Sequence, residues 1–562
     1  MIDHLTYFFY LHVFLFSSIG YGLKFSNIIS NNLVNLNFGW YGIIGFFLIS
    51  TFSVITSFFF AHNYYHNLII HIIGVFLFCI SYLENKKKIE YKYLIILSLC
   101  LLIGAYVFKN HDDFPYYHLT YALNLSENSF IVGTGNFSHG FRTFSSLFYY
   151  HSTLYLPFIE YYLFHIGPFY ILVFFNYIII FKLINDTRSN QNNLINYFAL
   201  LSLIFINIVF YRIGEHGTDR SSQILLILIF LVFIQILNLN NNKKLILTYL
   251  SLLAILITFA ASMKAIYYLY FLLLPVIFFK KKLFNEFLKK KNIVIISLVS
   301  LSIFLNLITN YLNTGCLLYP AEKTCLIKQE WSIPSDEVKL MSTHYEWWAK
   351  AGGGPGYSHE LKKDEYIKNF IWLNNWIQRH FFNKVSDTLF GTILICIIVI
   401  LTFFYFKRGK LKTIQNKNIL TYFLILIFFI EWFLNHPAMR YGGFVLIGLP
   451  LILFSSSLIS RFLISKKNLK NLIIFFIILS IVVFNLRNFI RINKEIKVYG
   501  YDPIQSPFFY VDKVDSKIAA RGDDLKIYNP VDKMCWASKT PCSYRTNLKL
   551  GHFLWMRMVS RK

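Results

Sequence analysis

The chain has 562 residues, of which 56% are hydrophobic and 15% charged, and its mean hydropathy is +0.50. A soluble domain has about a quarter of its residues charged, so this composition excludes a water-soluble globule and indicates a polytopic membrane protein. The net charge of +26 would suit nucleic acid, but the lysines gather in short runs between apolar segments. Such runs are typical of cytoplasmic loops, so we expect membrane lipid as a partner and no nucleic acid.

Apolar segments that are long enough to cross a bilayer recur along the whole chain. A spanning helix needs about 20 apolar residues, and by this measure we expect about fourteen transmembrane helices. They are predicted over 5–22, 39–60, 66–83, 93–108, 156–184, 195–212, 222–238, 245–261, 265–280, 292–311, 388–407, 418–435, 441–459 and 471–489. The predicted fold class is therefore an all-α polytopic membrane protein.

The lysine runs also orient the spans. If every run is cytoplasmic, both termini face outward, and the start "MIDH" lacks the basic residues of a cleavable signal. We expect five regions: transmembrane helices in 1–92, a transmembrane core in 93–311 with an outward loop 109–155, an outward soluble loop domain in 312–387, further spans in 388–489, and an outward tail in 490–562. Loop 109–155 is expected to form amphipathic elements on the membrane surface. The alternation in "DLKIYNPV" predicts strands in the tail, so this region is expected to be small and α+β.

Four of the seven cysteines form two close couples, Cys316 with Cys325 and Cys535 with Cys542. Both couples lie in regions expected to face outward, and an oxidising compartment would allow each to form a disulfide. Their spacings differ from those of zinc sites, and no histidine pair accompanies them.

Two adjacent acids, Asp112 and Asp113, follow an apolar segment in a chain that is poor in acids. His111 and His118 lie beside them. Adjacent carboxylates at a lipid boundary are partly desolvated, which suits a general base or a divalent-cation site. The alternative is a pair of solvated loop acids. We favour the acids as catalytic and the histidines as substrate-binding residues.

Several other ionisable residues lie at the ends of apolar segments on the same predicted face. Arg440 and Arg142 could each hold a phosphate through a guanidinium, and we rank Arg440 above Arg142 as a phosphate ligand. The alternative for each arginine is an anchoring role at the membrane interface. Lys264 stands outside any lysine run, which favours a functional role over snorkelling to the headgroups. Asp219 and Arg220 are expected to line the same outward cavity, or else to belong to a solvated connection.

These features suit one reaction in particular. A lipid-linked phosphosugar would lie with its phosphate at the interface, a carboxylate would deprotonate an acceptor, and the cations would stabilise the departing phosphate. A lipid-anchored substrate would also explain why the enzyme is a membrane protein. No other cofactor is expected unless the aspartates hold a divalent cation.

The "HDD" in the first large outer loop, followed by amphipathic elements, many spans and a soluble tail, resembles the GT-C superfamily of polyprenyl-phosphate-dependent glycosyltransferases. The tail "CWASKTPC" and the loop "TGCLLYP…TC…WSIP" are similar to uncharacterised bacterial multispanning proteins grouped near them. The resemblance implies a GT-C-like core and a bacterial inner membrane location with both termini on the periplasmic or extracellular side. It also implies catalysis by Asp112 or Asp113 on a polyprenyl-phosphate sugar donor with a glycan, lipid or protein acceptor. About three spans that precede the acidic loop would form an added N-terminal unit.

Two other functions fit the same composition. A polymerase or ligase of O-antigen-type glycans would depend on Arg142, Arg220 and Arg440 rather than on the aspartates. A glycolipid flippase or transporter would place ionisable residues at mid-membrane and show repeat symmetry, and the sequence shows no repeat.

Overall fold

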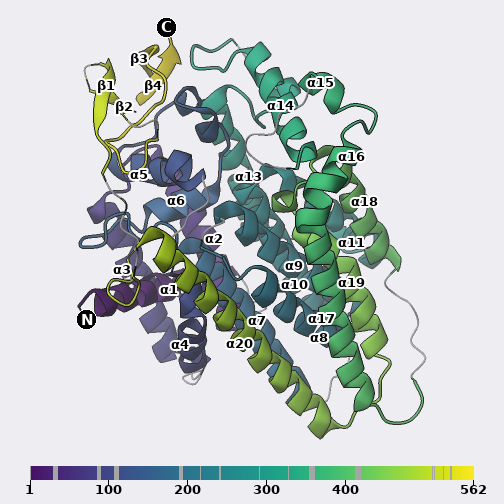
Figure 1. The fold of residues 1–562 in the computed structure, drawn as a ribbon. Helices are drawn as coiled ribbons and strands as arrows, with labels where there is room; N and C mark the ends of the chain where they lie inside the picture. Colours follow the sequence, from purple (N-terminus) through teal and green to yellow (C-terminus); the bar gives the residue numbers. More distant parts are fainter. Residues whose placement is uncertain are drawn as a thin grey trace.

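The computed structural model describes most of the chain, namely residues 2–29, 36–84, 90–106, 113–188, 194–214, 217–239, 242–289, 292–326, 328–352, 361–411, 419–500, 502–508, 511, 513–522, 524–531 and 534–562. These residues are mostly helical, with two small sheets near the C-terminus. Long helices form the body of the molecule, and the strands lie at its upper end together with α14 (Ser335–Lys350) and α15 (Lys363–Tyr366) (Figure 1).

Nine helical segments in the described residues are long and apolar enough to cross a membrane. They are α1 (Ile2–Ile29), α2 (Phe38–Ser57), α3 (Tyr64–Glu84), α7 (Gly167–Arg188), α9 (Gly217–Asn238), α10 (Lys243–Met263), α13 (Ile293–Thr314), α20 (Lys466–Tyr499), and the continuous stretch of α16 (Leu373–Trp376), η8 (Ile377–Val385) and α17 (Ser386–Tyr405). Four shorter apolar helices accompany them: α4 (Glu90–Leu101) with η1 (Leu102–Gly104), α8 (Leu194–Val209), α18 (Ile419–Asn435) and α19 (Gly443–Ile459). This is the architecture of a multi-pass membrane protein.

Two of the predicted spans have a different local structure. The segment predicted over 156–184 begins with turns, and its helix α7 starts only at Gly167. The segment predicted over 265–280 divides into a 3-10 helix, η5 (Ala265–Leu272), and the short α11 (Leu273–Lys281), followed by α12 (Phe284–Phe287). Hydropathy reports burial in an apolar environment and does not report helical continuity, so both segments were predicted as longer helices than the chain forms.

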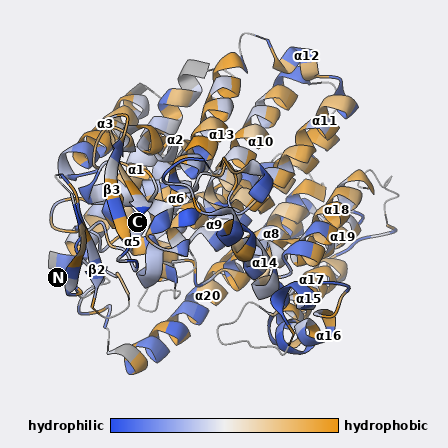
Figure 2. Cartoon of the chain, turned by 90° about the horizontal axis from the view of Figure 1, so that it is seen from above, coloured by the Kyte–Doolittle hydropathy of each residue, from blue (hydrophilic) through white to orange (hydrophobic). Residues whose placement is uncertain are grey.

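Helices α2, α9 and α10 are buried along most of their length and are apolar on most of their surface, as expected for buried helices. Hydrophobic residues predominate in long helices such as α10, α13 and α19, whereas polar residues are concentrated on the strands and around α14 and α15 (Figure 2). Asn176 of α7 and Asn207 of α8 exchange amide hydrogen bonds of 3.0 and 2.8 Å, and Asn207 also donates to Ser480 of α20 at 3.3 Å. Polar side chains of this kind hold helices together where the hydrophobic effect between them is weak.

The segment that follows α4 and η1 folds into short helices that the C-terminal tail covers. These are η2 (Phe114–His118), α5 (Leu119–Glu127), η3 (Thr134–Asn136), η4 (His139–Arg142) and α6 (Ser146–Ser152). Their residues are mostly buried, and the tail contributes to this burial, since Thr540 donates to Glu127 at 2.5 Å and Val132 pairs with Met558. The expectation that these elements lie at the membrane surface stays a prediction.

The tail contains two antiparallel hairpins, as its alternating pattern indicated. β1 (Ser516–Arg521) pairs with β2 (Lys526–Pro530), and β3 (Leu548–Phe553) pairs with β4 (Met556–Arg561). Disulfides join Cys535 to Cys542 in the tail and Cys316 to Cys325 beside η7 (Glu322–Thr324).

A carboxylate on α14 joins three distant parts of the chain. Glu337 accepts from Arg142 at 2.7 Å, from Arg545 at 2.8 Å and from Arg561 at 2.5 Å. Burial opposes ionisation of Glu337, but hydrogen bonds from Arg142 and Arg561 lower its pKa to about 2. The contacts therefore fix α14 against both the η4 segment and the tail, and we call these four residues the Glu337 clamp.

Candidate functional site

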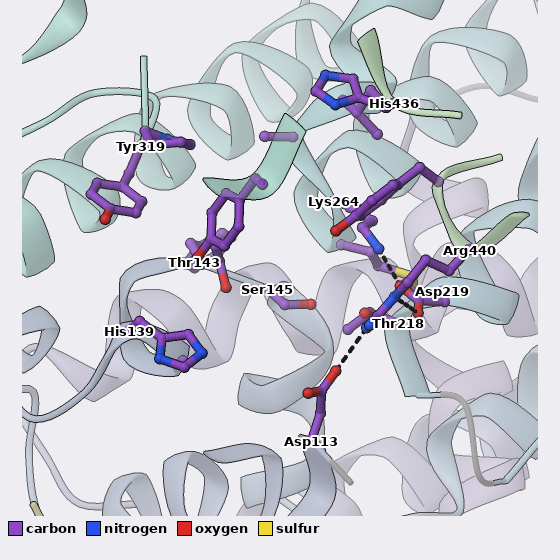
Figure 3. Close-up of a pocket in the computed structure, with 18 of the residues that line it drawn as sticks. Asp113, His139, Thr143, Ser145, Thr218, Asp219, Lys264, Tyr319, His436 and Arg440 are labelled. Carbon is purple, nitrogen blue, oxygen red and sulfur yellow. Dashed lines mark hydrogen bonds and ion pairs between the residues drawn. The ribbon is translucent and has the colours of Figure 1, made fainter. Parts of the chain in front are cut away.

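A cavity of about 540 Å³ lies where the segment 113–148 and α14 meet the ends of α9, α10 and α18. Side chains from the segment 113–148, from α14, from η5 and from η9 (Met439–Tyr441) line it. Four charged side chains, Asp113, Asp219, Lys264 and Arg440, come together on one side, while His139 and Tyr319 lie on the other with Thr143 and Ser145 between them (Figure 3). The cavity therefore has a charged side and a neutral polar side.

Arg440 connects the two carboxylates of the charged side. Its Nε donates to Oδ2 of Asp219 at 2.7 Å, and its Nη2 donates to Oδ2 of Asp113 at 2.7 Å. The Nζ of Lys264 forms an ion pair with Oδ1 of Asp219. Although burial opposes its charge, Asp219 and Asp113 raise the pKa of Arg440 well above the ordinary value of arginine. Among the described residues, two cations and two anions therefore balance in this cluster.

Local backbone geometry brings these side chains to the cavity. Asp219 lies in the first turn of α9, where the helix dipole favours a negative charge. Lys264 is the C-terminal cap of α10, and its extended backbone ends that helix at the cavity. Arg440 lies in η9, and Gly442 follows it with φ +106°, a conformation that glycine adopts without strain. Asp113 immediately precedes the π-helical turn η2.

Aromatic side chains from α14 and η9 cover the two cations. The Nζ of Lys264 lies 4.4 Å from the ring centroid of Tyr441, and the Cζ of Arg440 lies 5.4 Å from that of Trp348. Tyr345 of α14 also lines the cavity. Contacts of this kind stabilise desolvated cations, and aromatic faces can also stack on the apolar faces of sugars. Sequence inspection did not assign Tyr345 or Trp348 to the site, because a tryptophan- and tyrosine-rich loop more commonly belongs to a membrane interface.

Three histidines supply neutral polar groups to the cavity. Burial, together with the charge of Arg142, lowers the pKa of His139, and its Nδ1 lies 2.9 Å from the hydroxyl of Tyr116. Burial and Lys363 lower the pKa of His344, and burial also lowers that of His436. Lowered pKa values keep these imidazoles neutral near pH 7, so each can donate one hydrogen bond and accept another. None of these three histidines was assigned to the site from the sequence, although His436 lies four residues before Arg440 and His139 lies three residues before Arg142.

The structure does not bring every predicted site residue to the cavity. Arg142 is 1% exposed and is held by Gly135 O at 3.0 Å, by Tyr319 at 3.0 Å and by Glu337, so it supports the cavity wall and is not available to a phosphate. Arg220 lies 5.7 Å from the ring of Phe210, away from the lining.

The remaining predicted residues lie behind the wall or outside the described chain. His118 is buried and packs 4.9 Å from the ring of Phe148, which itself lines the cavity. His111 and Asp112 lie outside the described residues. Within the described part of the chain, no group of three or more His, Cys, Asp or Glu side chains is placed to hold a metal ion.

A family model described as a domain of unknown function, DUF8201, matches residues 1–447. The chain therefore belongs to this family. The matched region includes Asp113, Asp219, Lys264 and Arg440 and ends before α20 and the tail. No curated protein and no solved structure matches the chain significantly.

Proposed function

We propose that this protein is a membrane glycosyltransferase of GT-C type that acts in the bacterial inner membrane. It would move a sugar from a polyprenyl-phosphate-linked donor to a glycan, lipid or protein acceptor on the non-cytoplasmic face. The observation that carries the proposal is the cavity at the helix ends, where Asp113 and Asp219 meet Arg440 and Lys264 beside the aromatic wall of α14.

The two carboxylates have different surroundings, which suggests different roles. The Asp113 side chain is 25% exposed and that of Asp219 is 8% exposed. We assign Asp113 as the general base that takes the proton of the acceptor hydroxyl or amine. We assign Asp219 as a positioning residue, because it is buried and holds both Lys264 and Arg440.

The reaction follows from these roles. The acceptor atom attacks the anomeric carbon of the sugar, its proton passes to Asp113, and the bond from that carbon to the phosphate oxygen breaks. The electron pair of the broken bond leaves with the polyprenyl phosphate. Arg440 and Lys264 stabilise the charge that grows on this phosphate, as preorganised cations do in a partly desolvated site.

The first test is complementation in a host whose surface glycan depends on this protein. We expect Asp113→Asn to lower glycan production about 100-fold or more at normal protein level, because loss of a general base typically costs this much. Asp336→Asn is the matched control, since Asp336 is an exposed acid on α14 outside the cavity.

Parallel variants separate the alternatives. Normal glycan in both Asp113→Asn and Asp112→Asn would disprove the assignment of these acids. Loss of glycan in Arg440→Ala alone would instead favour a polymerase or ligase.

The proposed orientation can be measured independently of any activity. We expect a membrane-impermeant maleimide to label Asp336→Cys in intact cells, and to label Lys410→Cys only after the membrane is permeabilised. The reason is that Lys410 lies in a lysine- and arginine-rich loop of the kind retained in the cytoplasm. The free cysteines, Cys79, Cys100 and Cys396, are first replaced by serine. The reverse labelling pattern would place the cavity on the cytoplasmic side.

A further inference from the structure

We infer that Asp113 and the phosphate group of the donor compete for Arg440. In the arrangement described above, Asp113 occupies the position on Arg440 that a phosphate would take. Binding of the phosphate then displaces Asp113 and releases it toward the acceptor. This inference rests on the proposed function and adds an order of binding to it, with the phosphate-bearing substrate first.

The geometry of Arg440 gives the first argument. Its guanidinium holds two carboxylates at once, through Nε and Nη2, at 2.7 Å each. A guanidinium fork is also suited to bidentate contact with a phosphate. The two carboxylates share the Nε–Nη2 edge of the guanidinium. A phosphate that binds this edge in a bidentate manner must therefore take over the donor that now serves Asp113 or the one that serves Asp219.

The burial of the two carboxylates determines which one a phosphate displaces from Arg440. Asp219 is nearly inaccessible, and Lys264 binds its other oxygen. Removal of Asp219 from Arg440 would leave a buried carboxylate with fewer partners, which is costly. The Asp113 side chain is more exposed, so the exchange of its contact with Arg440 for water costs less than the same exchange would cost for Asp219. Asp113 is therefore the group that a phosphate displaces.

Charge gives an independent argument for the exchange. Asp113 and Asp219 balance Arg440 and Lys264 in the resting cluster. A phosphate added to this cluster would lie beside two carboxylates of the same sign, and like charges in a partly desolvated site repel strongly. Departure of Asp113 removes part of that repulsion and leaves the phosphate facing two cations.

The exchange also has a chemical consequence. A carboxylate held by an arginine is stabilised in its charged form and is a weaker base than a free one. Release from Arg440 would therefore strengthen Asp113 as a base at the moment when the donor is in place. Before the donor binds, the same ion pair would keep the base from acting on water or on the acceptor.

The test measures phosphate binding and needs no knowledge of the sugar or the acceptor. Purified full-length protein in nanodiscs is titrated with decaprenyl phosphate, with inorganic phosphate and with decaprenol. We expect Asp113→Asn to bind decaprenyl phosphate about fivefold more tightly than the native protein, because a partly exposed competing ion pair is lost. Decaprenol affinity should not change. Tighter binding of both phosphates would show that the site recognises phosphate as such, and tighter binding of decaprenyl phosphate alone would show that the lipid chain is also required.

Glu431→Gln is the matched control. Glu431 lines the same cavity from α18, and its described hydrogen bond is with Asn435 at 3.4 Å and not with either cation. The substitution removes the same charge without breaking a contact to Arg440, so the affinity for decaprenyl phosphate should rise less than about twofold. Equal tightening in both variants would show a general charge effect and would overturn the exchange.

Other outcomes separate the exchange from the proposed function. Unchanged or weaker phosphate binding by both Asp113→Asn and Asp113→Ala, in variants with native thermal stability, would overturn the exchange. The transferase proposal would survive that result if the same variants lose the glycan. Conversely, tighter phosphate binding with normal glycan would support the exchange and contradict the role of Asp113 as the base.

Discussion

Substitution of Asp219 by asparagine is expected to lower the free energy of unfolding by about 3 to 5 kcal/mol, the usual cost of breaking a buried ion pair. The Asp219 side chain is 8% exposed and is the shared partner of Lys264 and Arg440. An asparagine leaves two cations facing one remaining carboxylate, that of Asp113. Thermal unfolding in detergent checks the expected loss, and the glycan assay should show loss of activity in the same variant.

Two further variants show whether the effect comes from the uncompensated charge. Asp186→Asn removes one acid from the Lys182–Asp186 pair of α7, in which each side chain is 19% exposed, and it should cost about 0.5 kcal/mol. The double variant Asp219→Asn with Lys264→Met should recover part of the lost stability, because it removes one of the unpaired cations. If Asp219→Asn and Asp186→Asn cost the same, the charged cluster does not contribute to stability as inferred.

The charged side of the cavity could be foreseen from the sequence. Asp113, Asp219, Lys264 and Arg440 each stand at the end of an apolar segment, in a chain with few acids. Ionisable residues in such places are costly and therefore mark candidate sites. A consistent assignment of the lysine runs to one face then placed all four on the opposite face, so their proximity was a natural expectation. Only the structure shows which cation pairs with which acid.

The rest of the site could not be foreseen, because it depends on contacts between distant residues. Glu337 looks like a solvated acid beside Asp336 in a polar segment, yet its partners Arg142 and Arg545 lie 195 and 208 positions away. Arg142 was predicted as a phosphate ligand from its isolated charge, and only the structure shows that Glu337 and Tyr319 occupy its guanidinium. Hydropathy and spacing contain no information on such pairings.

The helical layout was foreseen more fully than the elements near the cavity. Long apolar segments such as 222–238 and 292–311 correspond to the helices α9 and α13. The segments 156–166 and 265–272 are also largely apolar, but the first forms turns and the second forms a 3-10 helix that lines the cavity. Buried aromatic residues such as Tyr267 account for the apolar composition of the second segment without a continuous α-helix.

Substitution of Glu337 by glutamine is expected to loosen α14 and so to disturb the aromatic wall of the cavity. The change removes charge-assisted hydrogen bonds from Arg142, Arg545 and Arg561, and leaves the buried Arg142 without its carboxylate. We expect a loss of about 2 kcal/mol in the free energy of unfolding, since hydrogen bonds to charged groups contribute about 1.5 to 3 kcal/mol. Glycan production should also fall, because α14 holds Tyr345 and Trp348 at the cavity. Thermal unfolding in detergent and the glycan assay measure the two effects.

The pH dependence of this effect has a definite sign. The folded protein lowers the pKa of Glu337 from 4.5 to about 2, so the stabilisation is complete above pH 4.5 and is lost as the pH falls toward 2. The stability difference between the native protein and Glu337→Gln should therefore shrink as the pH is lowered through this window. Glu346→Gln breaks the ion pair with Lys350 on the same helix, one contact compared with the three that Glu337 makes, and should cost less than Glu337→Gln at neutral pH. The difference in unfolding free energy between the native protein and Glu337→Gln could instead stay constant down to low pH. That result would mean that the charge of Glu337 does not hold the clamp together and that apolar contacts fix α14.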